Sequence, residues 1–255
     1  RSKRLHALKR SAACVAAVFC VLFASANIMP IYTYAARIPV LGSIVQVLQI
    51  GSGGEVTDGA HGDAESYGDS VQLSFGSEAG SLDYVPHYSV AHYSAPNRVV
   101  MTFRGVRGMD FDELRESLLA SEAVSDAYRM MILDDSAFGI VIVLNDGWSC
   151  EVAEYSDPGA LMINFSEAES EDADDEVYYL RTEAMPYTDE LGLLCEEYHN
   201  EGATQLKTAS DNYIVTVGQY ETESEALEAL EELNETHGDK GLFVASSAAN
   251  ELPED

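Results

Sequence analysis

The chain has 255 residues, of which 46% are hydrophobic and 9% aromatic, and this composition is sufficient to fill the cores of two small domains. Its formal net charge is -30, and Glu55 is the first of its 44 acidic residues. Because this charge repels a phosphate backbone, the composition argues against a nucleic-acid partner and predicts a solvated, self-repelling surface.

Residues 11–36 predict a transmembrane helix. They carry no charge, exceed the roughly 20 residues that span a bilayer, and follow a basic stretch at residues 1–10. The basic stretch predicts a cytoplasmic tail. We therefore expect a single-pass protein of the cell membrane that contacts the lipid bilayer through residues 11–36 and has an extracytoplasmic C-terminus. The basic start, the apolar core and the small residues at 24–26 equally fit a cleaved signal peptide, and this alternative stays open.

Residues 37–50 predict an amphipathic helix on the outer membrane surface, because apolar residues recur there at helical spacing. The motif at and before its start consists of Asn27, Pro30, Ala35, Ala36, Arg37, Ile38, Pro39 and Gly42. This segment resembles the membrane-proximal part of single-span anti-sigma factors and related envelope proteins of Gram-positive bacteria. The resemblance implies an alternative function, the membrane and sensor part of an anti-sigma factor or related envelope-stress regulatory protein, with a cytoplasmic domain upstream.

Residues 51–80 are rich in Gly, Ser and acidic residues and poor in apolar ones. Apolar burial in such a segment cannot offset the entropy lost on ordering, so the composition predicts a flexible linker. His61 is a lone histidine within it and predicts no metal site, since a metal needs several converging ligands.

Residues 81–166 predict a β-rich domain with one helix. Alternating apolar residues at 87–104 predict a hairpin whose turn lies at 95–97. Residues 110–128 predict an amphipathic helix, for which Asp110 is a suitable N-cap. The pattern is similar to the AMIN group of envelope domains, which localise proteins to the cell wall. The similarity rests on Ser94, Pro96, Asn97, Arg98, Val99, Val100, Phe103, Leu161, Ile163 and Phe165.

An acidic hinge at 167–176 precedes residues 177–250, which contain two copies of a strand, a helix and a strand. Thr188 is the expected N-cap of the first helix, and Gly238 ends the second. Two such copies predict a βαββαβ module, a four-stranded antiparallel sheet with two helices on one face. The predicted fold class of the whole chain is therefore α+β.

The second copy resembles the SPOR domain. The residues that match its aromatic-x-Val-x-Val-Gly-x-Phe pattern are Tyr213, Val215, Val217, Gly218 and Tyr220, followed by helix residues Ser224, Glu225, Ala226, Leu230 and Leu233. The resemblance implies that the module binds peptidoglycan glycan strands that lack stem peptides.

A glycan site of this kind needs an open sheet face with aromatic rings and flat polar groups. If Leu180, Val215 and Val217 pack under the helices, the alternate side chains of the sheet face outward. The predicted glycan-binding residues are Tyr179, Arg181, Gln205, Lys207, Ile214, Thr216 and Tyr220. Alternatively, these are ordinary solvent-facing residues, or they contact a protein partner in the envelope.

The chain has no Gly-x-Ser-x-Gly, His-Glu-x-x-His or phosphate-binding motif and no metal-ligand spacing of Cys or His. Paired carboxylates for glycoside hydrolysis have no distinguishing mark among so many acidic residues. Cys150 and Cys195 are expected to be buried free thiols in different domains. The sequence therefore predicts a membrane-anchored, extracytoplasmic cell-envelope protein that is not an enzyme, uses no cofactor or metal, and binds peptidoglycan glycan strands.

Overall fold

The computed structural model describes residues 43–168, 176–248 and 251–255. The predicted basic tail, the predicted transmembrane helix at 11–36, the start of the predicted membrane-proximal helix and most of the predicted hinge therefore lie outside the described residues. Within the described part, no helix combines the length and the apolar character needed to cross a membrane.

The protein is mostly β, with strands making up 50% of the structure and helices 18%. The predicted α+β class is therefore wrong. The main reason lies in residues 43–81, which the sequence pattern assigned largely to a helix and a linker and which form five strands.

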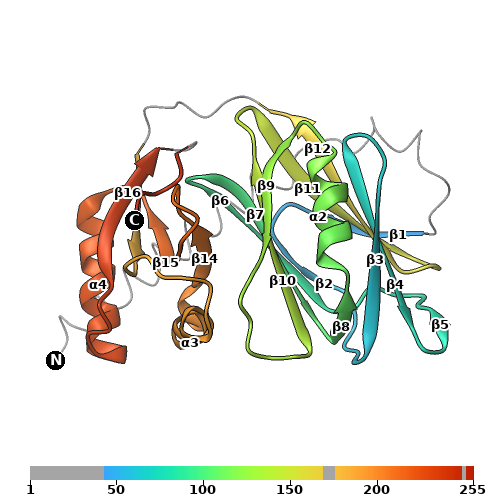
Figure 1. Ribbon diagram of the computed structural model, residues 1–255, viewed down its shortest axis with the longest axis horizontal. Coiled ribbons are helices and arrows are strands. Elements are labelled where there is room, and N and C mark those ends of the chain that lie inside the picture. The colour runs from blue at the N-terminus through green and yellow to red at the C-terminus, as the bar shows by residue number, and fades with distance from the viewer. Residues whose placement is uncertain (1–42, 169–175, 249–250) are drawn as a thin grey trace, which may run out of the picture.

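Residues 43–168, which we call the β-domain, form a sandwich of two sheets (Figure 1). One sheet has seven strands, in the order β1-β11-β12-β4-β3-β8 with β5 paired to β4, and the other has five, in the order β2-β6-β7-β10-β9. The strand bounds are β1 Ser43–Leu48, β2 Gly51–Gly53, β3 Ala60–Ser66, β4 Ser70–Ser77, β5 Gly80–Ser81, β6 Tyr88–Ser94, β7 Asn97–Arg104, β8 Val106–Met109, β9 Val124–Arg129, β10 Ala137–Leu144, β11 Trp148–Ser156 and β12 Ala160–Glu167.

The predicted linker at 51–80 is wrong, because β3 and β4 belong to the core sheet. In β3 the buried positions hold small residues, Ala60, Gly62 and Ala64, so the alternation carries little hydrophobicity. In β4 the alternation is plain, and Leu73 and Phe75 are buried between the sheets. The low apolar content of residues 51–80 therefore gave no strand signal. In β3 and β4 every second side chain is nevertheless buried, as in a sheet with one face against a core.

The predicted membrane-proximal helix is wrong over the described part of 37–50. Residues 43–48 form β1, which pairs antiparallel with β11 at the edge of the seven-stranded sheet. Ile44, Val45 and Val47 are β-branched, and such residues fit a pleated strand better than a helix. Ile44 and Val45 remain exposed on this edge.

The predicted hairpin is confirmed, and so is the start of the helix after it, but the helix predicted over 110–128 ends at Leu119 and Val124–Arg129 form β9. Strands β6 and β7 pair through Ser94 and Asn97, and Phe103 is fully buried in the sandwich core. Helix α2, Phe111–Leu119, begins at its N-cap Asp110, whose carboxylate accepts hydrogen bonds from the backbone N–H groups of Asp112 and Glu113. It contacts β3 of one sheet and β9 of the other, so it closes one side of the sandwich (Figure 1).

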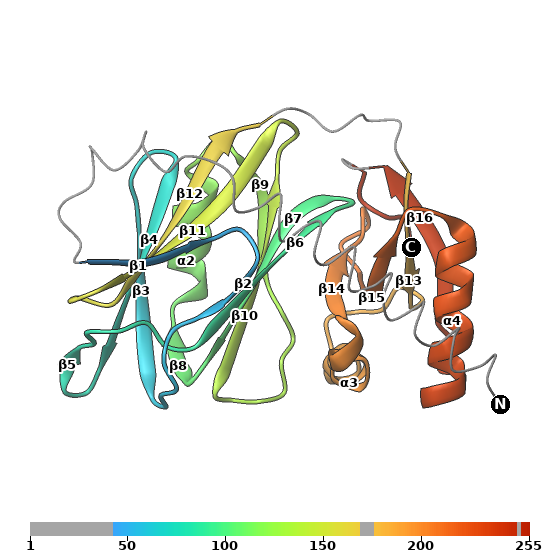
Figure 2. The same cartoon turned by 180° about the vertical axis from the view of Figure 1, so that it is seen from behind.

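Residues 176–248, which we call the C-terminal module, form a separate antiparallel sheet in the order β14-β15-β13-β16. Both α-helices of the module lie on one face of it (Figure 2), where Leu180, Val215 and Val217 pack against Leu191 and Leu233. The bounds are β13 Glu176–Arg181, α3 Asp189–Glu197, a 3-10 turn at His199–Glu201, β14 Thr204–Lys207, β15 Tyr213–Tyr220, α4 Glu223–His237 and β16 Phe243–Ala248.

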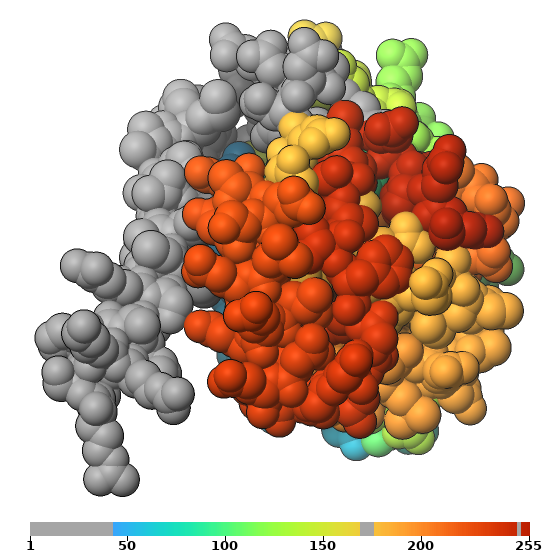
Figure 3. Space-filling view, turned by 90° about the vertical axis from the view of Figure 1, so that its left-hand side faces the viewer, coloured from blue at the N-terminus to red at the C-terminus, as the bar shows by residue number. Residues whose placement is uncertain are grey.

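Figure 3 looks onto the end of the molecule that the C-terminal module forms. Helix α4 lies on the surface there, and its exposed side chains include Glu223, Glu225, Glu228, Glu231, Glu232 and Glu235. The opposite side of the module packs against the β-domain, at β14, α3 and the β6–β7 turn (Figures 1 and 2). We call this contact the junction.

Candidate functional site

The sheet face that the sequence predicted to be open is covered. Tyr179, Arg181, Ile214 and Thr216 do lie opposite the helices, as strand alternation predicts, but their exposed fractions are 2%, 6%, 0% and 3%. The expectation that these residues offer a solvent-facing glycan surface is therefore wrong. The physical reason is that two other parts of the chain pack onto this face.

The first covering part is the tip of the β6–β7 hairpin. Arg98, which is 1% exposed, donates from Nη1 to the carbonyl oxygen of Ala95 at 2.8 Å and from Nη2 to Oγ1 of Thr216 at 3.4 Å. Its guanidinium carbon lies 4.4 Å from the centre of the Tyr93 ring. Burial lowers the pKa of Arg98, while nearby tyrosines, first among them Tyr128, oppose that shift. Arg98 thus ties the β-domain to the sheet of the module.

The second covering part is the C-terminal segment 251–255. Arg181 donates from Nη1 to the carbonyl oxygen of Glu254 at 2.7 Å, and the backbone N–H of Ala209 donates to the carbonyl oxygen of Pro253 at 3.0 Å. The carboxylate of Asp255 accepts a hydrogen bond from Oγ1 of Thr208 at 2.6 Å. Arg181 is therefore a structural residue that holds the end of the chain.

The other predicted site residues, Gln205, Lys207 and Tyr220, lie on the helix side of the sheet. In the register of β14 and β15, Gln205 pairs with Val215 and Lys207 pairs with Tyr213, so both share the face of their partners. Tyr220 packs into the core under the helices, because Gly218 adopts a positive φ of 69° and breaks the alternation of β15. The seven predicted residues therefore do not form one surface.

Gln205 links the two parts of the molecule directly. Its Nε2 donates to the carbonyl oxygen of Met131 and its Oε1 accepts from the N–H of Met131, both at 2.7 Å. The side-chain amide thus pairs with the backbone just beyond β9 as another strand residue would. Close approach at this point also needs Gly192 in α3, since a Cβ there would lie 3.1 Å from side-chain atoms of Met131 and Leu133.

Lys207 lies at the centre of the junction. Its Nζ is 3.1 Å from a carboxylate oxygen of Asp126 in β9 and 2.8 Å from one of Asp211, and its backbone N–H donates to the hydroxyl of Tyr128 at 3.1 Å. The hydrogen bond to Asp211 is the main cause that raises the pKa of Lys207. Burial raises the pKa of Tyr128 to about 12, against the lowering effect of Arg98. Both groups therefore keep their protons at neutral pH.

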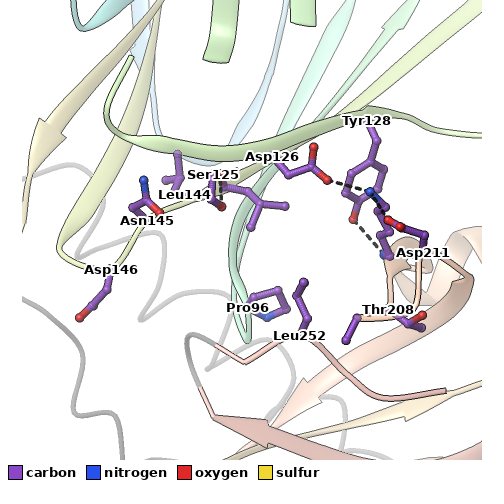
Figure 4. Close-up of a pocket in the computed structure, with 13 residues that line it drawn as sticks. Pro96, Ser125, Asp126, Tyr128, Leu144, Asn145, Asp146, Thr208, Asp211 and Leu252 are labelled. Atoms are coloured by element: carbon purple, nitrogen blue, oxygen red, sulfur yellow. Dashed lines mark hydrogen bonds and ion pairs between the residues drawn. The ribbon is translucent and has the colours of Figure 1, made fainter. Parts of the chain in front are cut away.

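A pocket of about 390 Å³ opens on one side of this contact (Figure 4). The β-domain contributes the β9 strand and the β10–β11 turn to its wall, and the C-terminal module contributes the segment after β14. Most of its polar groups are hydroxyl, carboxylate and amide side chains, namely Ser125, Asp126, Asn145, Asp146, Thr208 and Asp211. Lys207 and the Tyr128 ring complete this part of the wall. We call it the acidic pocket.

A second pocket, of about 360 Å³, adjoins the first and shares Asp126, Tyr128 and Lys207 with it. Its wall contains three cationic side chains, Arg115, Arg129 and Lys207, and four aromatic rings, Phe111, Tyr128, Tyr187 and Tyr213. We call it the basic pocket.

In the described part of the chain, no group of three or more His, Cys, Asp or Glu side chains could hold a metal ion. Cys150 is buried and Cys195 is half-buried, and both are free thiols in different parts of the molecule. Burial raises the pKa of Cys195 to about 11, so its thiolate is scarce at neutral pH.

No family model matches the chain, and a search of the curated proteins finds no match.

The sequence pattern does not point to the junction residues Asp126 and Tyr128. They lie in a stretch that the sequence pattern assigned to the end of the helix after Asp110 but that forms β9, and no motif distinguishes them from neighbouring residues. Asp126 and Lys207 are 81 positions apart, and only the docking of the module on the β-domain brings them together.

Proposed function

We propose that the chain is a non-enzymatic, membrane-anchored protein of the bacterial cell envelope that binds peptidoglycan glycan strands, and that the glycan binds at the junction. In this proposal the membrane anchor is the uncharged segment 11–36, which follows the basic residues at 1–10. The SPOR-like order of residues in β15 and α4 supports the choice of ligand. The proposed site differs from the sheet face opposite the helices, where the strand alternation predicted a glycan site.

The acidic pocket is the observation that carries the proposal. Sugar hydroxyls are both donors and acceptors, and they pair best with carboxylate, amide and hydroxyl side chains held in fixed positions. Two such groups are already fixed: Asp126 is held by Arg115 and Lys207, and Asn145 donates to the carbonyl oxygen of Glu122 at 2.8 Å. A neutral glycan would meet preorganised partners there.

A binding role fits this pocket better than catalysis. The wall contains no histidine or cysteine. The carboxylate oxygens of Asp126 are engaged by cations, and one of them also accepts from the N–H of Ala127 at 2.9 Å. A general acid or base needs a proton that it can exchange with the substrate, and these contacts instead hold the carboxylate in place.

The proposal is tested with the full chain in mild detergent and purified sacculi, either intact or stripped of stem peptides by an amidase. We expect binding that increases on stripping. Asp211→Asn should weaken it several-fold, because the carboxylate becomes a weaker acceptor at the pocket wall. Asp211 has a positive φ of 62°, which asparagine also tolerates, so the fold should persist.

The matched control is Asp63→Asn, the same change at an exposed position of β3 in the seven-stranded sheet. It should bind as the unchanged chain does. Absence of binding to both forms of sacculi would exclude the glycan function, and equal losses in the two variants would exclude the acidic pocket as the site.

A further inference from the structure

The basic pocket reverses the charge of the molecule around it. After residue 50 the chain has only eight Lys and Arg residues, and three of them line this one pocket. Its wall has one carboxylate, that of Asp126, whereas the acidic pocket next to it has three aspartates and one lysine. In a chain with a net charge of -30, such a concentration of cations marks a site where an anion is favoured.

Two of the three cations, Arg115 and Lys207, are held in place by hydrogen bonds and ion pairs. These contacts do not use all of their N–H donors. Arg115 donates from Nε to the carbonyl oxygen of Ala127 at 2.9 Å and from Nη2 to Asp126 at 3.1 Å. Lys207 is held by Asp126 on one side and by Asp211 on the other. Since a guanidinium has five N–H donors, Arg115 can still donate to a ligand.

Arg129 is the cation that is free to meet a ligand. Its side chain is exposed at the end of β9, and within the described residues it has no carboxylate in ion-pair distance. Its guanidinium carbon lies 5.3 Å from the centre of the Phe138 ring, which orients the group without neutralising its charge.

Three of the four aromatic rings of the pocket contact one another. Tyr213 lies 5.8 Å from Tyr128 in an edge-on arrangement and 5.2 Å from Tyr187, measured between ring centres. Tyr187 is 41% exposed, so part of its ring faces solvent. An exposed ring beside fixed cations offers a flat apolar surface to one face of a ring-shaped ligand while the cations bind its charge.

We propose that the basic pocket binds an anionic sugar, one that carries a carboxylate or a phosphate group. The charged group pairs with Arg129 and Arg115, and the sugar ring lies against Tyr187. This inference rests on the proposed function for the sugar part of the ligand. It deepens that function, because a glycan strand at the junction would then bind through its neutral hydroxyls in the acidic pocket. Its acidic substituent would bind in the basic pocket.

The test is an NMR titration of the isotope-labelled full chain, in detergent and at low salt, with glucuronate, glucose 6-phosphate and glucose. We expect at least one of the two anionic sugars to bind about tenfold more tightly than glucose, as one charge-assisted contact allows. The comparison of the two shows whether carboxylate or phosphate is preferred. Their affinities should fall as the ionic strength rises.

Arg129→Gln should remove most of this preference. Its matched control is Lys240→Gln, which removes one exposed positive charge from the turn between α4 and β16, outside the pocket wall. The control should leave the preference for anionic sugars over glucose unchanged, because the charge that binds the anion lies within the pocket.

The inference is overturned if neither anionic sugar binds more tightly than glucose, or if Lys240→Gln weakens binding as much as Arg129→Gln does. Its failure is distinguishable from failure of the proposed function. Binding to sacculi without a preference for anionic sugars would reject the inference alone, and that preference without binding to sacculi would reject the proposed function alone.

Discussion

At the scale of single residues, burial separates the predicted site from the observed one. Alternation along β13 and β15 correctly predicted that Tyr179, Arg181, Ile214 and Thr216 share one face. It could not predict exposure, because a period of two fixes only the direction of a side chain and the covering segments are distant in sequence. Arg98 and Arg181, which a sequence reading assigns to the surface, are both buried.

Arg98→Ala should lower the free energy of unfolding by about 3 kcal/mol, since it leaves a cavity and removes the donor for the carbonyl oxygen of Ala95. Urea unfolding measures the change. Arg104→Ala removes an exposed arginine at the end of β7 and should change stability by less than about 0.5 kcal/mol. Equal effects of the two substitutions would contradict the role assigned to Arg98.

His237 makes the stability of the module depend on pH. Its ring nitrogens lie 3.1 Å from Glu197 and 3.2 Å from Glu201, and these contacts, that with Glu197 first, raise its pKa above the ordinary value of 6.5. A raised pKa in the folded state stabilises the protein fully below about pH 6.5, and that stabilisation is lost as the pH rises through the raised pKa.

The Tm difference between the unchanged chain and His237→Gln should therefore be larger at pH 5.5 than at pH 8.5. Thermal unfolding followed by circular dichroism at both values measures it. The matched control is His199→Gln, the same change at an exposed histidine of the 3-10 turn that makes neither of these two contacts. A Tm difference that is the same at both pH values would show that the two contacts do not depend on the charge of His237.

At the scale of elements, the sequence predicted those that carry a strong local signal. Helix α2 has a capping aspartate, and β7 has a clear alternation of apolar residues. The strands β1 and β3 were missed because exposed Ile and Val at a sheet edge resemble an amphipathic helix, and Ala and Gly in a strand resemble a linker. Pairing with β11 and β4 fixes their strand conformation, and a local sequence pattern cannot predict this pairing.

The two helices of the module allow a test of capping. Thr222 accepts a hydrogen bond from the N–H of Glu225 at 3.3 Å, whereas Thr188, the N-cap of α3, makes no side-chain cap bond. Thr222→Ala should therefore lower the free energy of unfolding by about 1 kcal/mol, and Thr188→Ala by clearly less. Chemical denaturation of both variants decides this. A larger loss from Thr188→Ala would contradict the cap geometry.

At the scale of the whole molecule, the junction turns two parts into one unit. Its bonds join residues that are far apart in sequence, so sequence patterns that describe each part separately cannot predict it. The predicted glycan residue Gln205 illustrates this. Its position in an amphiphilic strand suggested a ligand, but its side chain instead satisfies both backbone groups of Met131.

Gln205→Ala should lower the free energy of unfolding by about 2 kcal/mol, because it leaves both backbone groups of Met131 without their partner. Differential scanning calorimetry should also show the β-domain and the module unfolding in separate transitions. Gln72→Ala, in β4 of the β-domain, should keep a single transition. Separate transitions in the unchanged chain would contradict the cooperative junction.

We propose that the ligand binds between the β-domain and the C-terminal module. Amide hydrogen exchange of the full chain, with and without glycan strands stripped of stem peptides, tests this most directly. We expect slower exchange in 124–129 of the β-domain and in 204–211 of the module at the same glycan concentrations. Protection confined to one part, or to the buried face of β13 and β15, would contradict it.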